Sequence, residues 1–354
     1  MRIAVIGSGV AGMGAAWRLS REHEVVLFER ESRLGGHTHT HKVSQGERSY
    51  SVDSGFIVFN ADNYPLFSRM LDELGVPSQA TTMSFSVQDA RSGLEYNATD
   101  FDGLFCQRRN LVSPRFWGMV RDILRFYREA PALLALPGEG PSLGDYLAQN
   151  RYSQLFIEDH LVPMASALWS SPAEGIMGFP AKYLARFMDN HHMLQVQGRP
   201  PWRVVSGGSS SYIRALEKDW KVQVRLSSPV RQVRRDADGV DVRTDAGVER
   251  FDQVLLACHS DQALALLADP SAAETEVLGA IPYQANETVL HTDARLLPTR
   301  RKAWAAWSAY VPAEPGAACT VSYCMNLLQG LESRDPFVVT LNRSKDIDPA
   351  KVLA

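Results

Sequence analysis

Three glycines near the start of the chain have the spacing of a turn that binds a pyrophosphate. Gly7, Gly9 and Gly12 complete the pattern Gly-x-Gly-x-x-Gly. Gly7 permits a tight turn, Gly9 lets backbone N–H groups approach the anion without an intervening side chain, and Gly12 lets a helix pack closely on its strand. The N–H groups of Val10 and Ala11, at the start of that helix, would then donate to the phosphate oxygens.

The residues around these glycines predict the elements that must hold them. Residues 3–6 form a short β-prone apolar run, and residues 13–21 have helical spacing. A second apolar strand, residues 25–28, ends at Glu29, whose carboxylate can accept hydrogen bonds from an adenosine ribose. The alternative is that Glu29 is an ordinary solvated charge at a strand end. The combination of a strand, a glycine turn, a helix and a second strand that ends in an acidic residue predicts a dinucleotide site.

The same segment could be interpreted as a secretory leader, because one arginine precedes a mostly apolar run. A leader needs an unbroken apolar core of roughly 7–15 residues followed by a cleavage site with small residues. Gly7, Ser8 and Gly9 interrupt the run, and charged residues follow from Arg18 onward. We therefore interpret the segment as part of the folded protein.

The sequence after Glu29 resembles the FAD-binding enzymes of the amine oxidase superfamily. Glu29 and Arg30 lead into Leu34-Gly35-Gly36-His37, which resembles the Glu-x(5)-Gly-Gly continuation of that superfamily. Residues 323–331 are most similar to bacterial proteins described as predicted NAD/FAD-binding and amine-oxidase-like. Four further segments are similar to superfamily patterns: Asp53 with Gly55, residues 205–216, residues 228–233, and residues 251–258.

The resemblance implies an FAD cofactor and an α/β fold, in which a discontinuous Rossmann-type FAD-binding domain carries an inserted α+β substrate domain. We expect residues 1–58 and 204–268 in the FAD-binding domain, and residues 59–203 and 269–354 in the substrate domain. The first insertion is expected to be helical and the second to supply strands. The residues assigned to FAD are Gly7, Gly9, Val10, Ala11, Gly12, Glu29, Arg30, Gly35, Gly36, His37, Asp53, Gly55 and Val230.

The end of the sequence differs from the superfamily, which usually closes the flavin site with a C-terminal glycine-rich strand and helix. Here no glycine follows Gly330, and the sequence stops at Ala354. We therefore expect the C-terminal FAD segment to be absent. FAD should then be held weakly, because several amide contacts of about 1 kcal/mol each would be missing.

Composition is consistent with a cytoplasmic enzyme. A chain of 354 residues with 45% hydrophobic content and a net charge of −3 can bury a large core and has no bias toward nucleic acid. No stretch approaches the roughly 20 apolar residues of a membrane helix.

The four cysteines form no secreted disulfide framework. Cys319 and Cys324 have a Cys-x4-Cys spacing, but residues five apart in a strand face opposite sides, so we interpret both as buried thiols.

Candidate catalytic residues are few, because a flavin carries its own electron-accepting centre. His37 directly follows the glycine pair and could lie at the flavin edge, or it could be a loop histidine. Strand alternation over residues 286–293 would place His291 on one face with Glu287 and Asp293, where a carboxylate–imidazole pair could act on the substrate. The alternative is a structural histidine. Tyr323 is a third candidate, from a set of aromatic residues that favours an apolar pocket.

Histidines also follow His37 at alternate positions, His39 and His41. Three histidines at this spacing could suggest a metal, but no Cys or carboxylate ligand pattern accompanies them. We expect no metal site.

The sequence lacks two features that would help to identify the type of reaction. Many amine oxidases place a lysine in the substrate domain, and we find no equivalent, because Lys302 lies in the basic turn Arg300-Arg301-Lys302. No second Gly-x-Gly-x-x-Gly is present to bind NAD(P)H. We expect an FAD-dependent oxidoreductase, of oxidase, dehydrogenase or desaturase type, acting on a hydrophobic or amine-bearing small molecule. A flavin-dependent mutase or isomerase and a non-catalytic flavin-binding protein are the alternatives, and the electron acceptor is not identified.

Residues 116–127 combine an apolar helical stripe with flanking arginines. A helix that touches a membrane has this pattern, and it would fit a lipid-like substrate, but a packed surface helix has the same pattern. We favour the packed helix and keep peripheral membrane contact as the alternative. The stripe consists of Phe116, Met119, Val120, Ile123, Leu124 and Tyr127.

Overall fold

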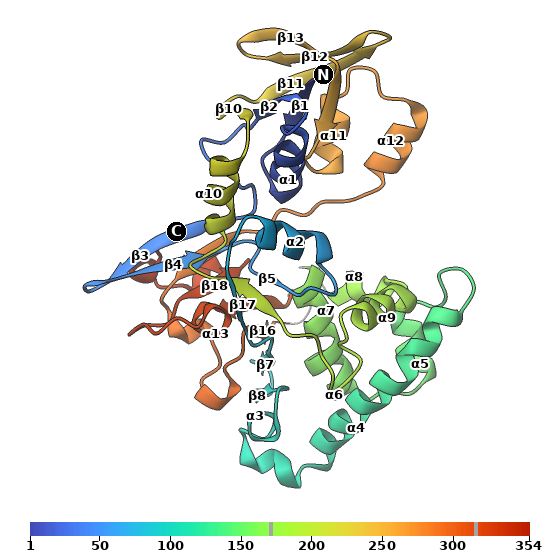
Figure 1. Cartoon of the computed structure of the whole chain (residues 1–354). Coiled ribbons are helices and arrows are strands. Elements are labelled where there is room, and N and C mark those ends of the chain that lie inside the picture. Colours follow the sequence, from blue (N-terminus) through green and yellow to red (C-terminus); the bar gives the residue numbers. More distant parts are fainter. Residues whose placement is uncertain (170–172, 315–317) are drawn as a thin grey trace.

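The computed structural model describes residues 1–169, 173–314 and 318–354, which form two lobes (Figure 1). The upper lobe in that view contains a four-stranded parallel sheet in the order β10-β2-β1-β14. Its strands are β1 (Arg2–Ile6), β2 (Glu24–Phe28), β10 (Val222–Arg225) and β14 (Gln253–Leu256). Segments far apart in the sequence therefore meet in one Rossmann-type sheet.

Both faces of this sheet are covered, because β1 and β2 are apolar at nearly every position. On one face, Val5 and Leu27 pack with Trp17 and Tyr212. On the other face, Ala4 and Phe28 pack against an antiparallel three-stranded sheet. The covering elements are α1 (Val10–Leu19), α10 (Ser210–Asp219), β11 (Val230–Asp236), β12 (Gly239–Thr244) and β13 (Gly247–Phe251).

The lower lobe is built on a six-stranded mixed sheet in the order β15-β18-β17-β16-β7-β8. Its strands are β7 (Phe85–Asp89), β8 (Leu94–Asn97), β15 (Thr288–His291), β16 (Trp307–Val311), β17 (Thr320–Cys324) and β18 (Val338–Leu341). The prediction that the first insertion is helical is therefore incomplete. Residues 85–97 contribute two strands, because β7 pairs in parallel with β16 from the second insertion.

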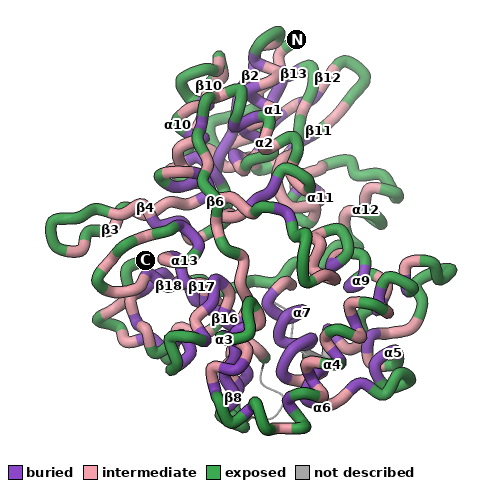
Figure 2. The backbone as a smooth tube through the Cα atoms, turned by 60° about the horizontal axis from the view of Figure 1, so that its bottom comes forward, coloured by how far each residue is buried: buried purple, intermediate pink, exposed green. Residues whose placement is uncertain are grey.

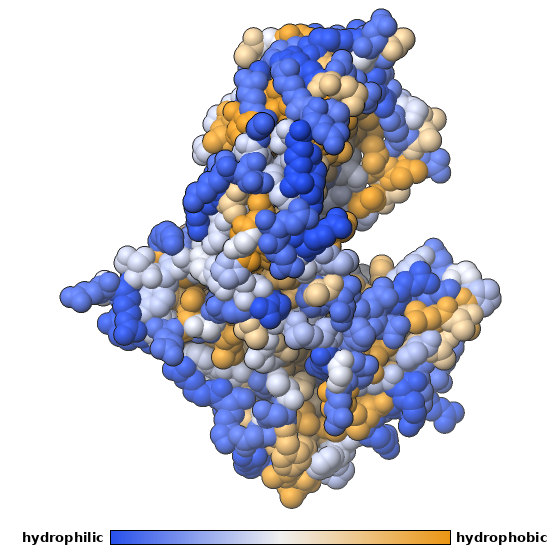
Figure 3. All heavy atoms as spheres, in the orientation of Figure 1, coloured by the Kyte–Doolittle hydropathy of each residue, from blue (hydrophilic) through white to orange (hydrophobic). Residues whose placement is uncertain are grey.

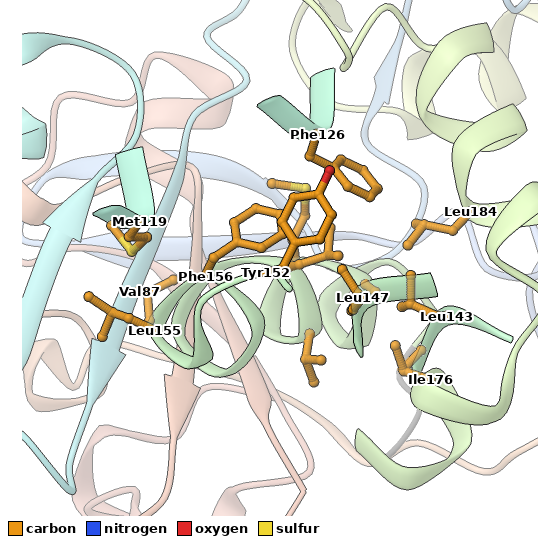
Figure 4. Close-up of a cluster of buried hydrophobic side chains, with 14 of the residues drawn as sticks. Val87, Met119, Phe126, Leu143, Leu147, Tyr152, Leu155, Phe156, Ile176 and Leu184 are labelled. Atoms are coloured by element: carbon orange, nitrogen blue, oxygen red, sulfur yellow. The ribbon is translucent and has the colours of Figure 1, made fainter. Parts of the chain in front are cut away.

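Helices of the first insertion form the largest apolar core together with this sheet. Phe126, Tyr152 and Phe156 lie at its centre, and Val87 of β7 joins it (Figure 4). The helices are α3 (Phe101–Leu104), α4 (Pro114–Glu129), α5 (Leu143–Gln149), α6 (Gln154–Phe156), α7 (Val162–Trp169), α8 (Ala173–Gly178) and α9 (Ala181–Asn190). A π-helical turn, Ile157–Leu161, joins α6 to α7.

The remaining elements connect the two lobes or lie at their edges. The β3–β4 hairpin projects to one side, and β5-β9-β6 forms a small antiparallel sheet (Figure 1). These elements are β3 (Thr40–Gln45), β4 (Arg48–Asp53), β5 (Val58–Phe59), β6 (Ser78–Ala80), β9 (Arg203–Val205), α2 (Pro65–Glu73), α11 (Ser260–Leu266), α12 (Ala272–Gly279) and α13 (Met325–Gln329). The exact domain boundaries stay a prediction.

The apolar stripe of α4 faces the protein core. Phe116 and Met119 are almost fully buried in the core shown in Figure 4, whereas Leu124 is exposed. Figure 2 shows the same alternation of buried and exposed residues along the outer helices. The stripe is therefore that of a packed surface helix. Within the part of the chain that the structure describes, no helix combines the length and the apolar character needed to cross a bilayer.

Candidate cofactor and substrate site

The glycine turn lies between the end of β1 and the start of α1, beside β14. Gly7 has φ +101°, and a Cβ there would lie 2.7 Å from the carbonyl oxygen of Ala257. A Cβ on Gly12 would lie 1.9 Å from the carbonyl oxygen of Gly7. At Gly9, by contrast, no atom of the described residues lies within 4 Å of the Cβ position. Two glycines therefore permit the packing of the turn, and the third leaves open space in front of the helix.

This open space is suited to an anion. Val10 and Ala11 are exposed at the N-terminus of α1, and the first turn of that helix carries no acidic side chain. The order in which the chain adds strands to the sheet reverses between β1 and β14. In open α/β sheets, ligands bind at the carboxyl ends of the strands where this order reverses. The turn therefore fits the pyrophosphate of a dinucleotide, as predicted from the sequence.

Glu29 lies directly after β2 and beside the turn. Its carboxylate accepts hydrogen bonds from the backbone N–H of Ser8 at 2.9 Å, from the Ser8 hydroxyl at 2.5 Å and from the N–H of Glu31 at 2.9 Å. Burial raises the pKa of Glu29, but the hydrogen bonds from Glu31 and Ser8 outweigh burial and hold the pKa below its ordinary value. The carboxylate is therefore charged and fixed in orientation. Arg30, its exposed neighbour, pairs with Glu31 at 3.0 Å.

The second glycine loop packs directly on the first. The N–H of Gly35 donates to the carbonyl oxygen of Ser8 at 3.0 Å, and a Cβ on Gly36 would lie 3.0 Å from the Cα of Gly9. A Cβ on Gly55 would lie only 1.5 Å from the carbonyl oxygen of His37. The backbones of these segments are therefore in direct contact. The predicted cofactor residues Gly35, Gly36 and Gly55 lie in the same region of the structure as the first glycine turn.

His37 is exposed, and its ring centre lies 5.5 Å from that of His259. His259 follows β14 and stacks on Tyr283 with ring centres 4.3 Å apart. His37 therefore lies at the carboxyl end of the parallel sheet, and its role at the flavin stays a prediction. Val230 is the first residue of β11, on the sheet that covers the nucleotide domain.

Asp53 lies in a different environment from the one we expected for a residue that contacts the cofactor. It is fully buried, and it accepts hydrogen bonds from the hydroxyl of Thr40, the N–H and hydroxyl of Ser209, and the amide of Gln329. Burial raises the pKa of Asp53, and the bonds from Thr40 and Ser209 oppose this only in part. The carboxylate thus joins the β3–β4 hairpin to the N-terminus of α10 and to α13.

A cavity of about 410 Å³ lies in the lower lobe, between the six-stranded sheet and the helices of the first insertion. It reaches Val58 in β5, three residues beyond Gly55, and Trp202, which precedes β9. Phe85, Met164 and Trp307 form part of its apolar wall. The cavity wall therefore includes the segment that follows Gly55 in the chain.

His160 lines this cavity from the π-helical turn. It is 1% exposed, its Nδ1 lies 2.8 Å from the hydroxyl of Tyr96, and its Nε2 has no hydrogen-bond partner among the described residues. The Tyr96 hydroxyl donates its single proton to the carbonyl oxygen of Asp159 at 2.7 Å, so it accepts from Nδ1–H of His160. Nε2 is therefore unprotonated. Burial lowers the pKa of His160 to about 3, which keeps the ring neutral.

The structure does not contain the carboxylate–imidazole pair predicted for His291 and Asp293. The ring is fully buried, its Nδ1 accepts from the N–H of Asp293 at 3.0 Å, and its Nε2 lies 2.8 Å from the hydroxyl of Thr340. The Asp293 carboxylate pairs with Arg295 and Lys351 instead of the imidazole. Burial lowers the pKa of His291 to about 4. Both ring nitrogens therefore have partners within the fold, which favours the structural alternative, and a catalytic role for His291 stays a prediction.

Tyr323 lies in β17, where its ring packs edge-on against Trp307 at 5.2 Å. Trp307 separates it from the cavity, because Trp307 is a wall residue and Tyr323 is not. Burial raises the pKa of Tyr323 to about 12. A direct catalytic role for Tyr323 stays a prediction.

The remaining candidates for metal or thiol chemistry are His39, His41 and the four cysteines. His39 and His41 stack with ring centres 4.0 Å apart, and no group of three or more metal-binding side chains is found among those residues. The thiols are free, and burial raises the pKa of Cys319 to about 11.

Sequence reasoning missed the polar residues of the cavity, above all His160 and Arg199. Only one signal could have indicated His160: the polar triplet Glu158-Asp159-His160 stands within the mostly apolar run of residues 155–169. Arg199 lies in a proline-containing loop and carries no periodic signal.

Comparison with known proteins identifies the family. Residues 10–303 match the family described as "Flavin containing amine oxidoreductase". A putative flavin-containing monoamine oxidase, AofH of Mycobacterium tuberculosis, is 25% identical over 76% of this chain. The chain spans 59% of that relative's length.

Solved structures show the same fold. A variant of putrescine oxidase matches with a TM-score of 0.69 and 15% identity, over 99% of this chain and 78% of that one. A fatty acid isomerase from P. acnes that produces CLA matches with a TM-score of 0.62 and 16% identity, over 98% and 78%. The predicted α/β fold with a Rossmann-type domain is therefore confirmed. The family match and the flavin-containing relatives indicate FAD as the cofactor, and the contacts of the glycine turn and Glu29 with it stay predictions. The chain belongs to the flavin-containing amine oxidoreductase family.

Proposed function

We propose that this protein is an FAD-dependent oxidoreductase whose substrate is a hydrophobic small molecule bound in the 410 Å³ cavity. The observation that carries the proposal is continuity: the cavity wall includes Val58, three residues after Gly55 of the cofactor loop. Apolar pockets with a few polar groups are the usual form of small-molecule sites.

The cofactor and the residues of the cavity have different roles in the proposed reaction. When bound, FAD supplies a two-electron acceptor for the reaction. Phe85, Met164 and Trp307 exclude water from the substrate, and the neutral His160 lines the cavity with a buried Nε2 that has no partner among the described residues. Such a nitrogen accepts a hydrogen bond from a substrate or takes up a proton from it.

Anaerobic mixing with hydrophobic candidate compounds tests this function. We expect the visible flavin absorbance to bleach with a suitable compound. Conversion without bleaching would instead indicate a mutase or isomerase, and binding without either would indicate a non-catalytic protein. Substitution Met83→Trp should fill the cavity and slow bleaching. Leu124→Trp, on the exposed face of α4, is the control and should leave the rate unchanged.

We also propose peripheral contact with an anionic membrane, through the tip of the lower lobe and not through the α4 stripe. Phe101 is 61% exposed and Val112 85% exposed, and this tip is orange at the bottom of Figure 3. Arg108, Arg109 and Arg115 lie exposed in the same segment. Exposed apolar side chains beside cations favour an interface that carries anionic lipids.

Flotation with lipid vesicles tests this contact. The protein should float with vesicles that contain phosphatidylglycerol and less with phosphatidylcholine alone. Val112→Asp should abolish flotation, whereas Val277→Asp, at a position 64% exposed on α12 in the other lobe, should not. Equal flotation of the two variants would refute the proposal. We further infer a cytoplasmic location, which the free thiols support.

A further inference from the structure

The cavity has an unusual balance of charge for a site that would bind an amine. Arg199 is the only formally charged side chain among the described residues that line it. A protonated amine would meet a guanidinium and find no carboxylate among these wall residues, so the amine would be repelled. An anion would be attracted to the guanidinium, and solvent moderates this attraction because Arg199 is exposed.

Arg199 is available to a ligand. It follows Gly198 in the segment between α9 and β9, and Pro200 and Pro201 restrict the backbone after it. Its Nε donates to the carbonyl oxygen of Gln195 at 3.0 Å, which holds the side chain. No carboxylate of the described residues pairs with its terminal nitrogens, and the residue is exposed. The guanidinium therefore keeps donors for a partner that arrives from solvent.

The guanidinium also lies near the polar part of the cavity wall. Burial raises the pKa of Tyr127 and the Arg199 charge opposes this, and the same charge adds to burial in lowering the pKa of His160. Tyr127 and His160 both line the cavity. Because His160 is neutral, it adds no second charge, and Arg199 determines which ligands the cavity prefers.

We propose that the cavity selects an amphipathic carboxylate, with the acidic group at the Arg199 guanidinium and the apolar part against the aromatic and aliphatic walls. This inference rests on the proposed function, since it takes the cavity as the substrate site. Arg is suited to the role, because its planar guanidinium binds a carboxylate through two parallel hydrogen bonds. The inference favours a hydrophobic substrate over the amine-bearing one that the sequence also left open.

Three probes of equal chain length test the inference: decanoate, decan-1-ol and decylamine. Trp202 and Trp307 line the cavity, so quenching of tryptophan fluorescence reports binding without any need for turnover. We expect decanoate to bind most tightly and decylamine least. Arg199→Gln should weaken decanoate binding about tenfold and leave decan-1-ol unchanged, because only the carboxylate loses a charged partner. Arg199→Glu should reverse the order of decanoate and decylamine.

Arg186→Gln is the matched control, because Arg186 is exposed on α9 but does not line the cavity. If Arg186→Gln weakens decanoate binding as much as Arg199→Gln does, a diffuse effect of positive charge explains the preference for decanoate, and the inference is wrong. Decylamine or decan-1-ol binding as tightly as decanoate would overturn the inference alone. Failure of all three probes to bind would instead overturn the assignment of the cavity as the substrate site.

Discussion

Alanine at Gly9 and alanine at Gly12 should have opposite consequences, although the two glycines are three residues apart. A Cβ at Gly12 would lie 1.9 Å from the carbonyl oxygen of Gly7 and 3.0 Å from the Cβ of Ala257. The first contact is with backbone, so α1 or the turn must move. Overpacking of this kind costs about 1–3 kcal/mol, and the better helix propensity of alanine recovers about 1 kcal/mol at most.

Gly9 is in another situation. Its backbone has φ −61° and ψ 173°, which alanine adopts freely, and no described atom lies within 4 Å of its Cβ position. Gly9→Ala should therefore leave the FAD-free protein as stable as the wild type, or up to about 1 kcal/mol more stable through the unfolded state. The new methyl group occupies the space in front of α1, so FAD should bind at least about tenfold more weakly, a loss of about 1.4 kcal/mol.

Two measurements on each protein separate these effects: thermal melting without FAD, and titration of FAD followed by flavin fluorescence. We expect Gly12→Ala to melt at a lower temperature than the wild type, and Gly9→Ala to melt normally but bind FAD weakly. Normal FAD affinity of Gly9→Ala would show that the pyrophosphate does not lie in this space. An unchanged melting temperature for Gly12→Ala would refute the packing argument.

Further predictions concern three carboxylates. Glu29→Lys should weaken FAD retention by roughly 1.5–3 kcal/mol, measured by dialysis, and unchanged retention would contradict the ribose assignment. Asp53→Asn should lower the free energy of unfolding in urea by about 1–3 kcal/mol, because buried donors lose a charged acceptor. Burial, with a hydrogen bond to Asp89 and the charge of Asp89, raises the pKa of Asp159 to about 7. This carboxyl stabilises the folded state while protonated, so that stabilisation should be lost as the pH rises from the ordinary value of 3.8 to the folded pKa of about 7, and Asp159→Asn should flatten this fall in pH-dependent melting.

The parts of the site that could be predicted from sequence depend on local geometry. The turn from Gly7 to Gly12 brings its N–H groups together within one strand–helix unit, and Glu29 ends the adjacent strand. The hairpin turn at residues 236–239 is equally local, and Gly239 there has φ +149°. In these cases the residues that determine the structure are also the residues that contact one another.

His291 shows why the pairing expected from strand alternation is not found. Alternation along residues 286–293 assumes that the strand continues to Asp293, but β15 ends at His291. Asp293 then turns away to bind Arg295, and pairing with β18 brings Thr340 to the imidazole. A residue 49 positions away thus determines the role of His291. Sequence alone does not show which strand will be the neighbour.

The two sites depend on each other through Asp53. Its carboxylate receives donors from Ser209 at the start of α10, in the nucleotide lobe, and from Gln329 in α13, beside the six-stranded sheet. Gln329 in turn receives a hydrogen bond on its carbonyl oxygen from Gln79, which precedes the cavity residue Thr81 by two positions. A substitution at Asp53 should therefore disturb both FAD affinity and ligand binding in the cavity. Asp53 therefore acts as a positioning residue that joins the two lobes, and a direct contact with the cofactor stays a prediction.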